Sequence, residues 1–500
     1  MSLSPDQIPV IAGVGEITDR SRDCTPAMEP LRLMAEAAHR ADGEARGLLR
    51  DVDSIDIVGL VSWRYENPTE QLCDLLHVKP ARAVYGEVGG ESPVRFLHQA
   101  AQRIARGESS IALVLGAEAQ YAVNNAKRAN IEPPWTPYAV NAPRFKRAAD
   151  YVHPLAIRQG VAWPVNVYPF YEVAAAHAWG QTPAQAQDET GRIWSAYSKV
   201  AASNPYAWLP KALTPHDITT PTADNRYISW PYTKRMVANP NVNQGAAVII
   251  TSLAKARAAG IPDDQLVFFG LGAFANDRRD WLSRDNYRHS IPQQVLLETM
   301  QAQRGGAFDA LELYSCFPIV PKFAQRTLGL APTAEPTVTG GLSFFGAPLN
   351  NHMTHAACAM VRRICDGAAN GLLYGQGEFV TKHYGLALGH EPVISDGVHD
   401  ITLDAGVQQR ADTLLGDARP IDETPDGDAE LETFTVVHDQ AGAPTHAVIL
   451  ARMPGGARTA ARTSQPDEIA WLTSAREFPV GARGRIHTGP DGLPEWRGHG

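Results

Sequence analysis

The chain has 500 residues, of which 44% are hydrophobic and 20% are charged, as in an ordinary soluble globular protein. This length exceeds a single hydrophobic core and predicts roughly two to four structural units. The formal net charge of −9 disfavours a nucleic-acid partner, which would select a basic surface. The sequence has no apolar run of about 18 residues and no basic N-terminal region followed by an apolar stretch. We therefore expect no membrane span, no signal peptide and a cytoplasmic location.

The cysteines are scattered along the chain without a Cys-x-x-Cys pair, at Cys24, Cys73, Cys316, Cys358 and Cys365. Their odd number and irregular spacing predict neither a disulfide framework nor a zinc site. Free thiols of this kind fit a reducing compartment.

The order of predicted elements repeats along the chain. Residues 10–17 (VIAGVGEI) form an apolar strand that ends in glycines, and residues 267–274 (VFFGLGAF) share its V-x-x-G-x-G frame. Each is followed by a helical segment (PLRLMAEAAHRA or PQQVLLETMQAQ) and a strand (SIDIVGLV or FDALELYS). A second helix and a glycine-rich strand complete each half. This alternation predicts two copies of one βαβαβ unit, with parallel strands covered by helices.

A glycine turn at residues 85–91 (YGEVGGE) leads into the second helix of the first half. Val94, Leu97, Ala101 and Ile104 recur at a helical spacing that predicts one buried face. Such a turn presents either a reactive side chain or a ring of backbone N–H groups at the helix N-terminus. No nucleophile stands at this turn.

Two further segments differ in character from the repeated halves. Residues 121–225 are rich in proline and aromatic residues and are too long for a structureless loop, so we expect an inserted subdomain. After residue 390 an acidic, turn-rich stretch precedes short strand-like runs at 432–439, 445–453, 458–464 and 481–488, which predict a small β-barrel. The expected domains are 1–120 with 226–256, then 121–225, 257–390 and 391–500.

The duplicated halves resemble the thiolase superfamily, and residues 203–252 are similar to its sterol-carrier-protein and acetyl-CoA acetyltransferase branch. The motifs LYSCFP (313–318), GGLSFFGAPLNNHMTH (340–355) and YGQGEFVTKH (374–383) resemble the thiolase-like proteins of type 1 from actinobacteria. Those proteins carry an extra C-terminal domain, and residues 391–500 look similar to the OB-fold module that partners thiolase-like aldolases. The resemblance implies a five-layered α-β-α-β-α thiolase fold with an inserted loop subdomain and a small C-terminal OB-like barrel.

The resemblance also locates four catalytic positions. The nucleophilic cysteine of thiolases falls on Gly90, the loop asparagine or histidine on Tyr314, the histidine of the Gly-His-Pro loop on Ala347, and the second cysteine on Gly375 or Tyr374. All four depart from the thiolase pattern. Because glycine holds no acyl group and alanine activates no thiol, covalent acyl transfer is excluded at this site.

The polar groups that remain define the candidate site. The catalytic candidates are Tyr314, His352, His355, His383 and Cys316, each of which also has a purely structural interpretation. The substrate-binding candidates are Gly90, Gly346 and Gly375 through their backbone N–H groups, with Asn350, Asn351 and Lys382. The candidates for the phosphates of coenzyme A are Arg144, Lys146, Lys234 and Arg235. We expect no metal.

Three functions are open at this point. The first is a lyase or condensing enzyme that acts on acyl-CoA thioesters without a covalent step, with Tyr314 as acid or base in a retro-aldol or Claisen-type reaction. The second is a non-catalytic acyl-CoA-binding or partner-binding protein. The third, acetyl-CoA acetyltransferase activity, is disfavoured by the missing cysteine. No cofactor is expected beyond a coenzyme A thioester as substrate or ligand. The protein is expected to be a monomer or a homodimer, with the C-terminal domain limiting the usual thiolase dimer.

Overall fold

The computed structural model describes residues 4–21, 26–395, 398–399, 401, 403–404 and 406–498, so Cys24 lies outside the described residues. The first half contains β1 (Pro9–Thr18), α1 (Pro30–Glu44), β2 (Ser54–Ile57), α2 (Pro68–Leu76), β3 (Arg82–Tyr85), α3 (Ser92–Ala105), β4 (Ile111–Ala119), β7 (Asn243–Ser252) and α9 (Leu253–Ala258). The second half contains β8 (Val267–Asn276), α10 (Ile291–Arg304), β9 (Ala310–Leu313), α11 (Ile319–Thr327), α12 (His352–Cys365), β10 (Asn370–Gly377) and β11 (Lys382–Gly389).

The strand order confirms the duplication. The sheet runs β3-β2-β4-β7-β1 in the first half and β8-β11-β10-β9 in the second, so corresponding strands occupy corresponding places. β1 and β8 touch through only two residue pairs, Val10 with Phe268 and Ile11 with Val267. The two halves therefore meet edge to edge at this short junction.

The expectation of parallel strands is only partly correct. β2 pairs in parallel with β3 and β4, and β9 with β10, but β7 and β11 run antiparallel to both of their main neighbours. The direction of β11 follows from its connection. A short hairpin at 378–381 joins β10 to β11, whereas a parallel pair of consecutive strands needs a crossover connection.

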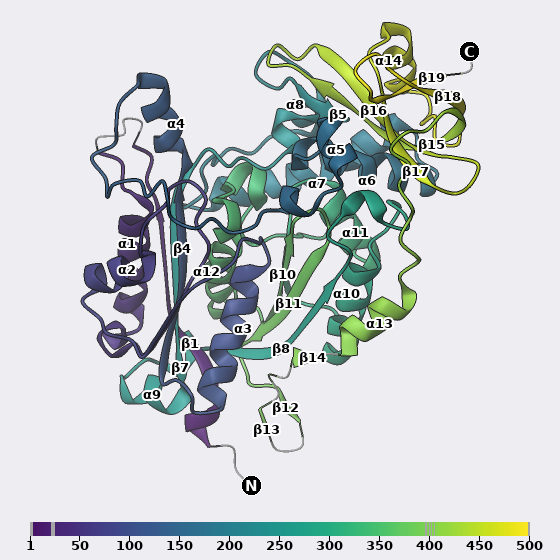
Figure 1. The fold of residues 1–500 in the computed structure, drawn as a ribbon. Coiled ribbons are helices and arrows are strands. Elements are labelled where there is room, and N and C mark those ends of the chain that lie inside the picture. Colours follow the sequence, from purple (N-terminus) through teal and green to yellow (C-terminus); the bar gives the residue numbers. More distant parts are fainter. Residues whose placement is uncertain are drawn as a thin grey trace.

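The helices and sheets form the five layers of the thiolase fold. α3 and α12 lie in the middle layer and contact strands of both halves, whereas α1 and α9 cover the outer face of the first half and α10 and α13 (Gly406–Leu414) that of the second (Figure 1). The face predicted for α3 is buried: Val94, Leu97, Ala101 and Ile104 are at most 1% exposed. The N-termini of both central helices thus lie inside the molecule.

The insertion between β4 and β7 is helical, as expected. It contains α4 (Gln120–Ala129), α5 (Pro154–Arg158), α6 (Pro164–Ala178), α7 (Pro183–Ser203), α8 (Pro215–Thr219), β5 (Tyr227–Trp230) and β6 (Tyr232–Thr233). Figure 1 shows α5, α6, α7 and α8 beside the C-terminal barrel, whereas α4 lies apart from them on the side of α1.

The C-terminal part contains a closed five-stranded β-barrel. Its strands are β15 (Gly427–His438), β16 (Pro444–Arg452), β17 (Arg458–Thr463), β18 (Arg483–Thr488) and β19 (Pro494–Gly498), with α14 (Pro466–Leu472) beside them. Pairing of β15 with β16 closes the ring. The short strands β12 (Ile394–Ser395), β13 (Val398–His399) and β14 (Leu403–Asp404) precede it. The four predicted strand runs are confirmed, and β19 is an additional strand.

Several contacts attach the barrel to the rest of the molecule, including a strand pairing and a buried arginine. β15 pairs with β5 of the insertion through Val436 with Trp230. Arg458, which is 1% exposed, pairs with Glu432 and donates to the carbonyl oxygens of Leu282 and Arg284 in the loop after β8. Because a buried guanidinium held by carbonyls tolerates little movement, the barrel and this loop form one rigid junction. In the described part of the chain, no helix is long and apolar enough to cross a membrane.

Candidate functional site

The glycine turn before α3 meets the two loops that the sequence predicts beside it. A Cβ atom built on Gly90 would lie 2.6 Å from Tyr314 Cζ, and closer still to the Tyr314 hydroxyl and the carbonyl oxygen of Gln376. Gly90, Tyr314 and the end of β10 are therefore packed against one another. The space that a nucleophilic side chain would need is filled by a phenol and a main-chain carbonyl.

The sequence analysis missed the most unusual side chain of this site, Glu91. It directly follows Gly90, is 3% exposed, and its carboxylate lies over the turn: a Cβ atom on Gly89 would be 2.6 Å from Glu91 Oε1, and one on Gly377 would also clash with it. The Lys382 ammonium nitrogen lies 2.6 Å from the same oxygen. Among the described residues neither oxygen accepts an aligned hydrogen bond, so the ion pair is the principal compensation for burying this charge.

The two asparagines of the NNHMTH motif hold main chain. Asn350 accepts a hydrogen bond from the Gly89 N–H group at 3.0 Å and donates to the Gly59 carbonyl at 2.8 Å. Asn351 donates to the Gly116 carbonyl at 2.6 Å. The Gly89 N–H group is thus already used and does not face a ligand. Asn351 directly precedes α12, and its side chain makes no capping hydrogen bond to that helix.

The three candidate histidines are buried in separate hydrogen-bond networks. His352 bridges the Gly346 carbonyl and Glu312, and His355 contacts Glu16 at 2.6 Å. On the outer side of β11, His383 contacts the Tyr374 hydroxyl at 2.7 Å. Burial lowers the pKa of His355, and it lowers that of His383 to about 3, so both are neutral at physiological pH.

Tyr314 and Cys316 are protonated in this environment. Burial raises the pKa of Tyr314 well above 10 and that of Cys316 to about 12. The Cys316 thiol lies 3.5 Å from Gln376 Oε1, and the Tyr314 ring stands edge-on to His352. Because a thiolate is the reactive form of cysteine, Cys316 is a poor nucleophile here. The protonated Tyr314 hydroxyl is suited to donate a hydrogen bond and is not available as a base at neutral pH.

Of the other candidates, Gly375 belongs to this cluster, and the basic residues proposed for coenzyme A have their own surroundings. Arg144 pairs with Asp150, Lys146 lies 5.6 Å from the Tyr151 ring centroid, and Arg235 donates to the Asp217 carbonyl. Lys234 is exposed at the same turn as Arg235. Gly346 and Gly375 pack tightly, against Gln244 and against the Glu91 main chain. Within the described ranges, no three His, Cys, Asp or Glu side chains gather as a metal site.

Comparisons with known structures define the class first. The chain superposes on the Ltp2-ChsH2(DUF35) aldolase (18% identity, TM-score 0.57, covering 77% of this chain and 98% of that one). It also superposes on human mitochondrial 3-ketoacyl-CoA thiolase in complex with CoA (12%, TM-score 0.55, covering 78% and 99%). These similarities, at low identity, establish a thiolase fold.

A second pair of findings is more specific. Residues 409–492 match the family model described as the thiolase-like protein type 1 additional C-terminal domain. The whole chain is similar to a monomeric SCP2-thiolase-like protein type 1 from Mycobacterium smegmatis, with 26% identity, a TM-score of 0.82 and coverage of 99% of this chain and 100% of that one. The resemblance to thiolase-like proteins of type 1 is therefore confirmed. A search of curated proteins gave no match.

Proposed function

We propose that this thiolase-fold chain is non-catalytic and that its own side chains close the position where thiolases hold the acyl group. One observation carries the proposal: the buried Glu91 carboxylate, paired with Lys382, lies over the glycine turn where a thiolase would hold an acyl group. A second carboxylate or thioester oxygen there would be repelled by this charge and excluded by its volume.

The chemistry of the surrounding groups supports the same proposal. Gly90 offers no nucleophile, Ala347 offers no base, and the protonated Cys316 does not replace them. His352 contacts the Gly346 carbonyl and His355 contacts Glu16, and the Gly89 N–H group is bonded to Asn350. The residues at these positions therefore cannot carry the covalent step of a thiolase mechanism.

A lyase acting on a β-hydroxyacyl-CoA is the second candidate, because the Tyr314 hydroxyl lies where the nucleophile would stand. A retro-aldol cleavage needs a base for the β-hydroxyl group and donors for the enolate oxygen, but no covalent nucleophile. The raised pKa of Tyr314 favours its acid form and thus disfavours it as that base.

The test is mass spectrometry of β-hydroxyacyl- and β-ketoacyl-CoA thioesters incubated with the protein, combined with calorimetric titration of the same compounds. We expect no product from the wild-type chain. We expect Glu91→Ala to bind a short acyl-CoA at least about tenfold more tightly than wild type, because the variant removes the competing charge. Glu87→Ala is the matched control, since Glu87 is exposed in the same turn. Cleavage that is lost in Tyr314→Phe would instead establish the lyase, and unchanged binding in Glu91→Ala would refute closure by this carboxylate.

A further inference from the structure

The hairpin between β10 and β11, at 378–381, has an unusual backbone. Glu378 and Val380 both have a φ of +59°, a left-handed conformation that glycine adopts readily and a β-branched valine rarely does. Residues in such conformations persist only where surrounding contacts hold them. The hairpin directly precedes Lys382, whose ammonium group pairs with Glu91 over the glycine turn. The conformation of the hairpin therefore sets where that ammonium group stands.

Contacts from α6 hold the first two residues of the hairpin. The Tyr168 hydroxyl donates to the Glu378 carbonyl oxygen at 2.7 Å. The Tyr171 hydroxyl donates to the Phe379 carbonyl oxygen at 2.8 Å. Both tyrosines are at most 1% exposed, so these bonds are shielded from competing water. The inserted subdomain thus fixes two of the four main-chain carbonyls of the hairpin.

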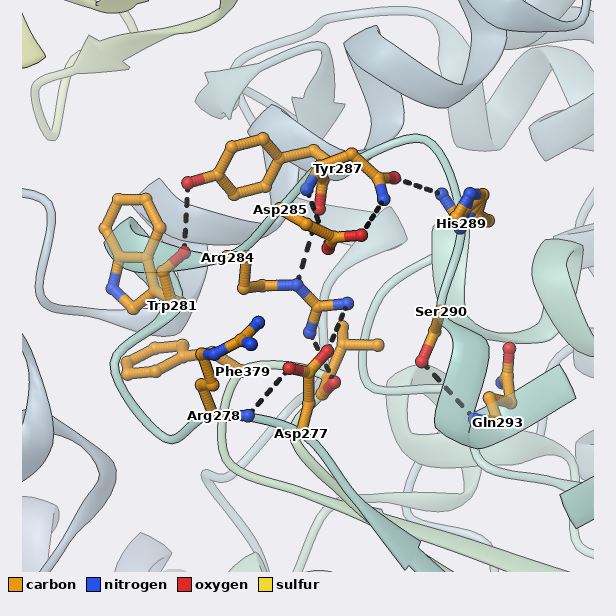
Figure 2. Close-up of polar contacts among 12 residues, drawn as sticks. Asp277, Arg278, Trp281, Arg284, Asp285, Tyr287, His289, Ser290, Gln293 and Phe379 are labelled. Atoms are coloured by element: carbon orange, nitrogen blue, oxygen red, sulfur yellow. Dashed lines mark hydrogen bonds and ion pairs between the residues drawn. The ribbon is translucent and has the colours of Figure 1, made fainter. Parts of the chain in front are cut away.

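The loop after β8 holds the other two residues. Arg284, which is 1% exposed, donates to the Val380 carbonyl oxygen at 2.8 Å and pairs with Asp277 at 2.9 Å. Figure 2 shows the Arg284 guanidinium group pointing toward Asp277. The main-chain N–H group of Asp277 donates to the Thr381 carbonyl oxygen at 2.8 Å. Every carbonyl oxygen of the hairpin therefore accepts a hydrogen bond from another part of the chain.

The C-terminal barrel holds this loop in turn. Arg458 of β17 donates to the main-chain carbonyl oxygen of Arg284 itself and, at 2.7 Å, to that of Leu282. Glu432 of β15 pairs with the Arg458 guanidinium group at 2.7 Å, which fixes the orientation of its donors. A continuous series of contacts thus runs from the barrel through Arg284 to the hairpin and on to Lys382.

We propose that the C-terminal barrel, through Arg458 and Arg284, clamps the hairpin in its strained conformation and thereby keeps the glycine turn closed. Relaxation of the hairpin toward ordinary φ values would move the start of β11, and the ammonium group of Lys382 with it. Arg284 is then a positioning residue, because it acts on the glycine turn through Lys382. The inference rests on the closure proposed above and assigns its cause to the barrel.

The test is hydrogen–deuterium exchange of the full chain, read by mass spectrometry of peptides that cover the hairpin and the glycine turn. Arg458→Lys keeps the positive charge but loses the guanidinium fork that bonds two carbonyls. We expect exchange at 378–382 and 86–91 to become about tenfold faster, while β16 exchanges as in wild type. Arg452→Lys, in an exposed pair with Glu430 of the same barrel, is the matched control and should change neither peptide.

A second pair of variants tests the strain and leaves the barrel intact. Glycine adopts a φ of +59° more readily than alanine does. The hairpin of Val380→Gly should therefore exchange about fivefold more slowly than that of Val380→Ala, although glycine is the less favourable residue in ordinary backbone. The two variants differ by one methyl group, so the comparison isolates the backbone conformation.

Glu432→Gln is a milder change at the barrel junction and should give the Arg458→Lys pattern at about threefold, which keeps the test valid if Arg458→Lys does not fold. Faster exchange that is confined to the loop at 281–287, with the hairpin and the glycine turn unchanged, would overturn the clamp. Equal or faster exchange in Val380→Gly than in Val380→Ala would overturn the strain on which it depends. Exchange is measured without a ligand, whereas the Glu91→Ala titration measures closure toward acyl-CoA, so failure of the clamp and failure of the proposed function are distinguishable.

Discussion

A methyl group at Gly90 tests how tightly the former nucleophile position is filled. In Gly90→Ala the new Cβ atom would stand 2.6 Å from Tyr314 Cζ, roughly 1 Å inside ordinary contact distance, with two oxygens closer still. One of these oxygens is the Gln376 carbonyl on β10, where Gln376 pairs with His383 of β11, and the Tyr314 side chain is buried, with 6% exposure. Overpacking of this kind costs about 1–3 kcal/mol. We expect a loss near 3 kcal/mol, because a main-chain group must shift.

The assay is urea unfolding, with Gly43→Ala as the matched control. Gly43 lies in α1, and a Cβ atom there would meet nothing within 4 Å, so alanine should stabilise the protein by about 0.5–1 kcal/mol. Adding Tyr314→Phe to Gly90→Ala should recover only part of the loss, since the Gln376 carbonyl and the Tyr314 ring carbon remain. Equal unfolding midpoints for Gly90→Ala and wild type would refute the packing described here. By the same argument, Gly90→Cys does not rebuild a thiolase.

Three further predictions concern the rest of the molecule. Arg458→Met should lower the free energy of unfolding in urea by about 3–5 kcal/mol, because it leaves buried carbonyls and Glu432 without their donor. The control Arg452→Met removes an exposed pair with Glu430 and should cost no more than about 1 kcal/mol. Similar losses in the two variants would contradict a rigid junction. Burial lowers the pKa of His98 to about 4, below its unfolded value of about 6.5, so stability should be complete above pH 6.5 and fall by up to about 3 kcal/mol towards pH 4. His98→Gln should flatten that part of the stability curve, and a wild-type slope in the variant would assign the effect to other groups. In native protein iodoacetamide should label Cys365, which is exposed, well before the buried Cys316 and Cys358, as followed by peptide mass spectrometry; early labelling of Cys316 would refute its raised pKa.

The fold could be predicted where the local pattern and the long-range arrangement agree. The helical spacing of Val94, Leu97, Ala101 and Ile104 gives the buried face of α3, because that helix contacts strands on both sides. The last barrel strand, Pro494–Gly498, was missed because its sequence alternates weakly and includes a proline and a glycine. Its place is set by antiparallel pairing with β18, which includes Ile486 with Trp496. A single strand's residues do not reveal such a partner.

The sequence predicts where the candidate site lies, but not which side chains fill it. The resemblance to thiolases assigns Gly90 and Tyr314 to one catalytic pocket, and the structure brings the two residues close together. Glu91 escaped notice because an acid at the start of a helix is commonly explained by the helix dipole. Its distinguishing property is burial against Gly377, a residue nearly 290 positions away, and only the fold supplies that contact. The three histidines were predicted as candidates, but their partners were not. These partners are Glu16, Glu312 and Tyr374, which lie on strands that no local sequence pattern connects to the histidines.

The replacements around Gly90 depend on one another physically. Loss of a nucleophile alone would leave a small cavity lined by backbone N–H groups, which would still attract a thioester oxygen. Here the Tyr314 phenol fills the volume and the Glu91 carboxylate supplies the negative charge, while Asn350 occupies the N–H group of Gly89. A buried carboxylate without a cation would cost several kcal/mol, so Glu91 requires Lys382, which the hairpin after β10 places 2.6 Å away. The Lys382 ammonium group is therefore paired with Glu91 and is part of the same buried cluster.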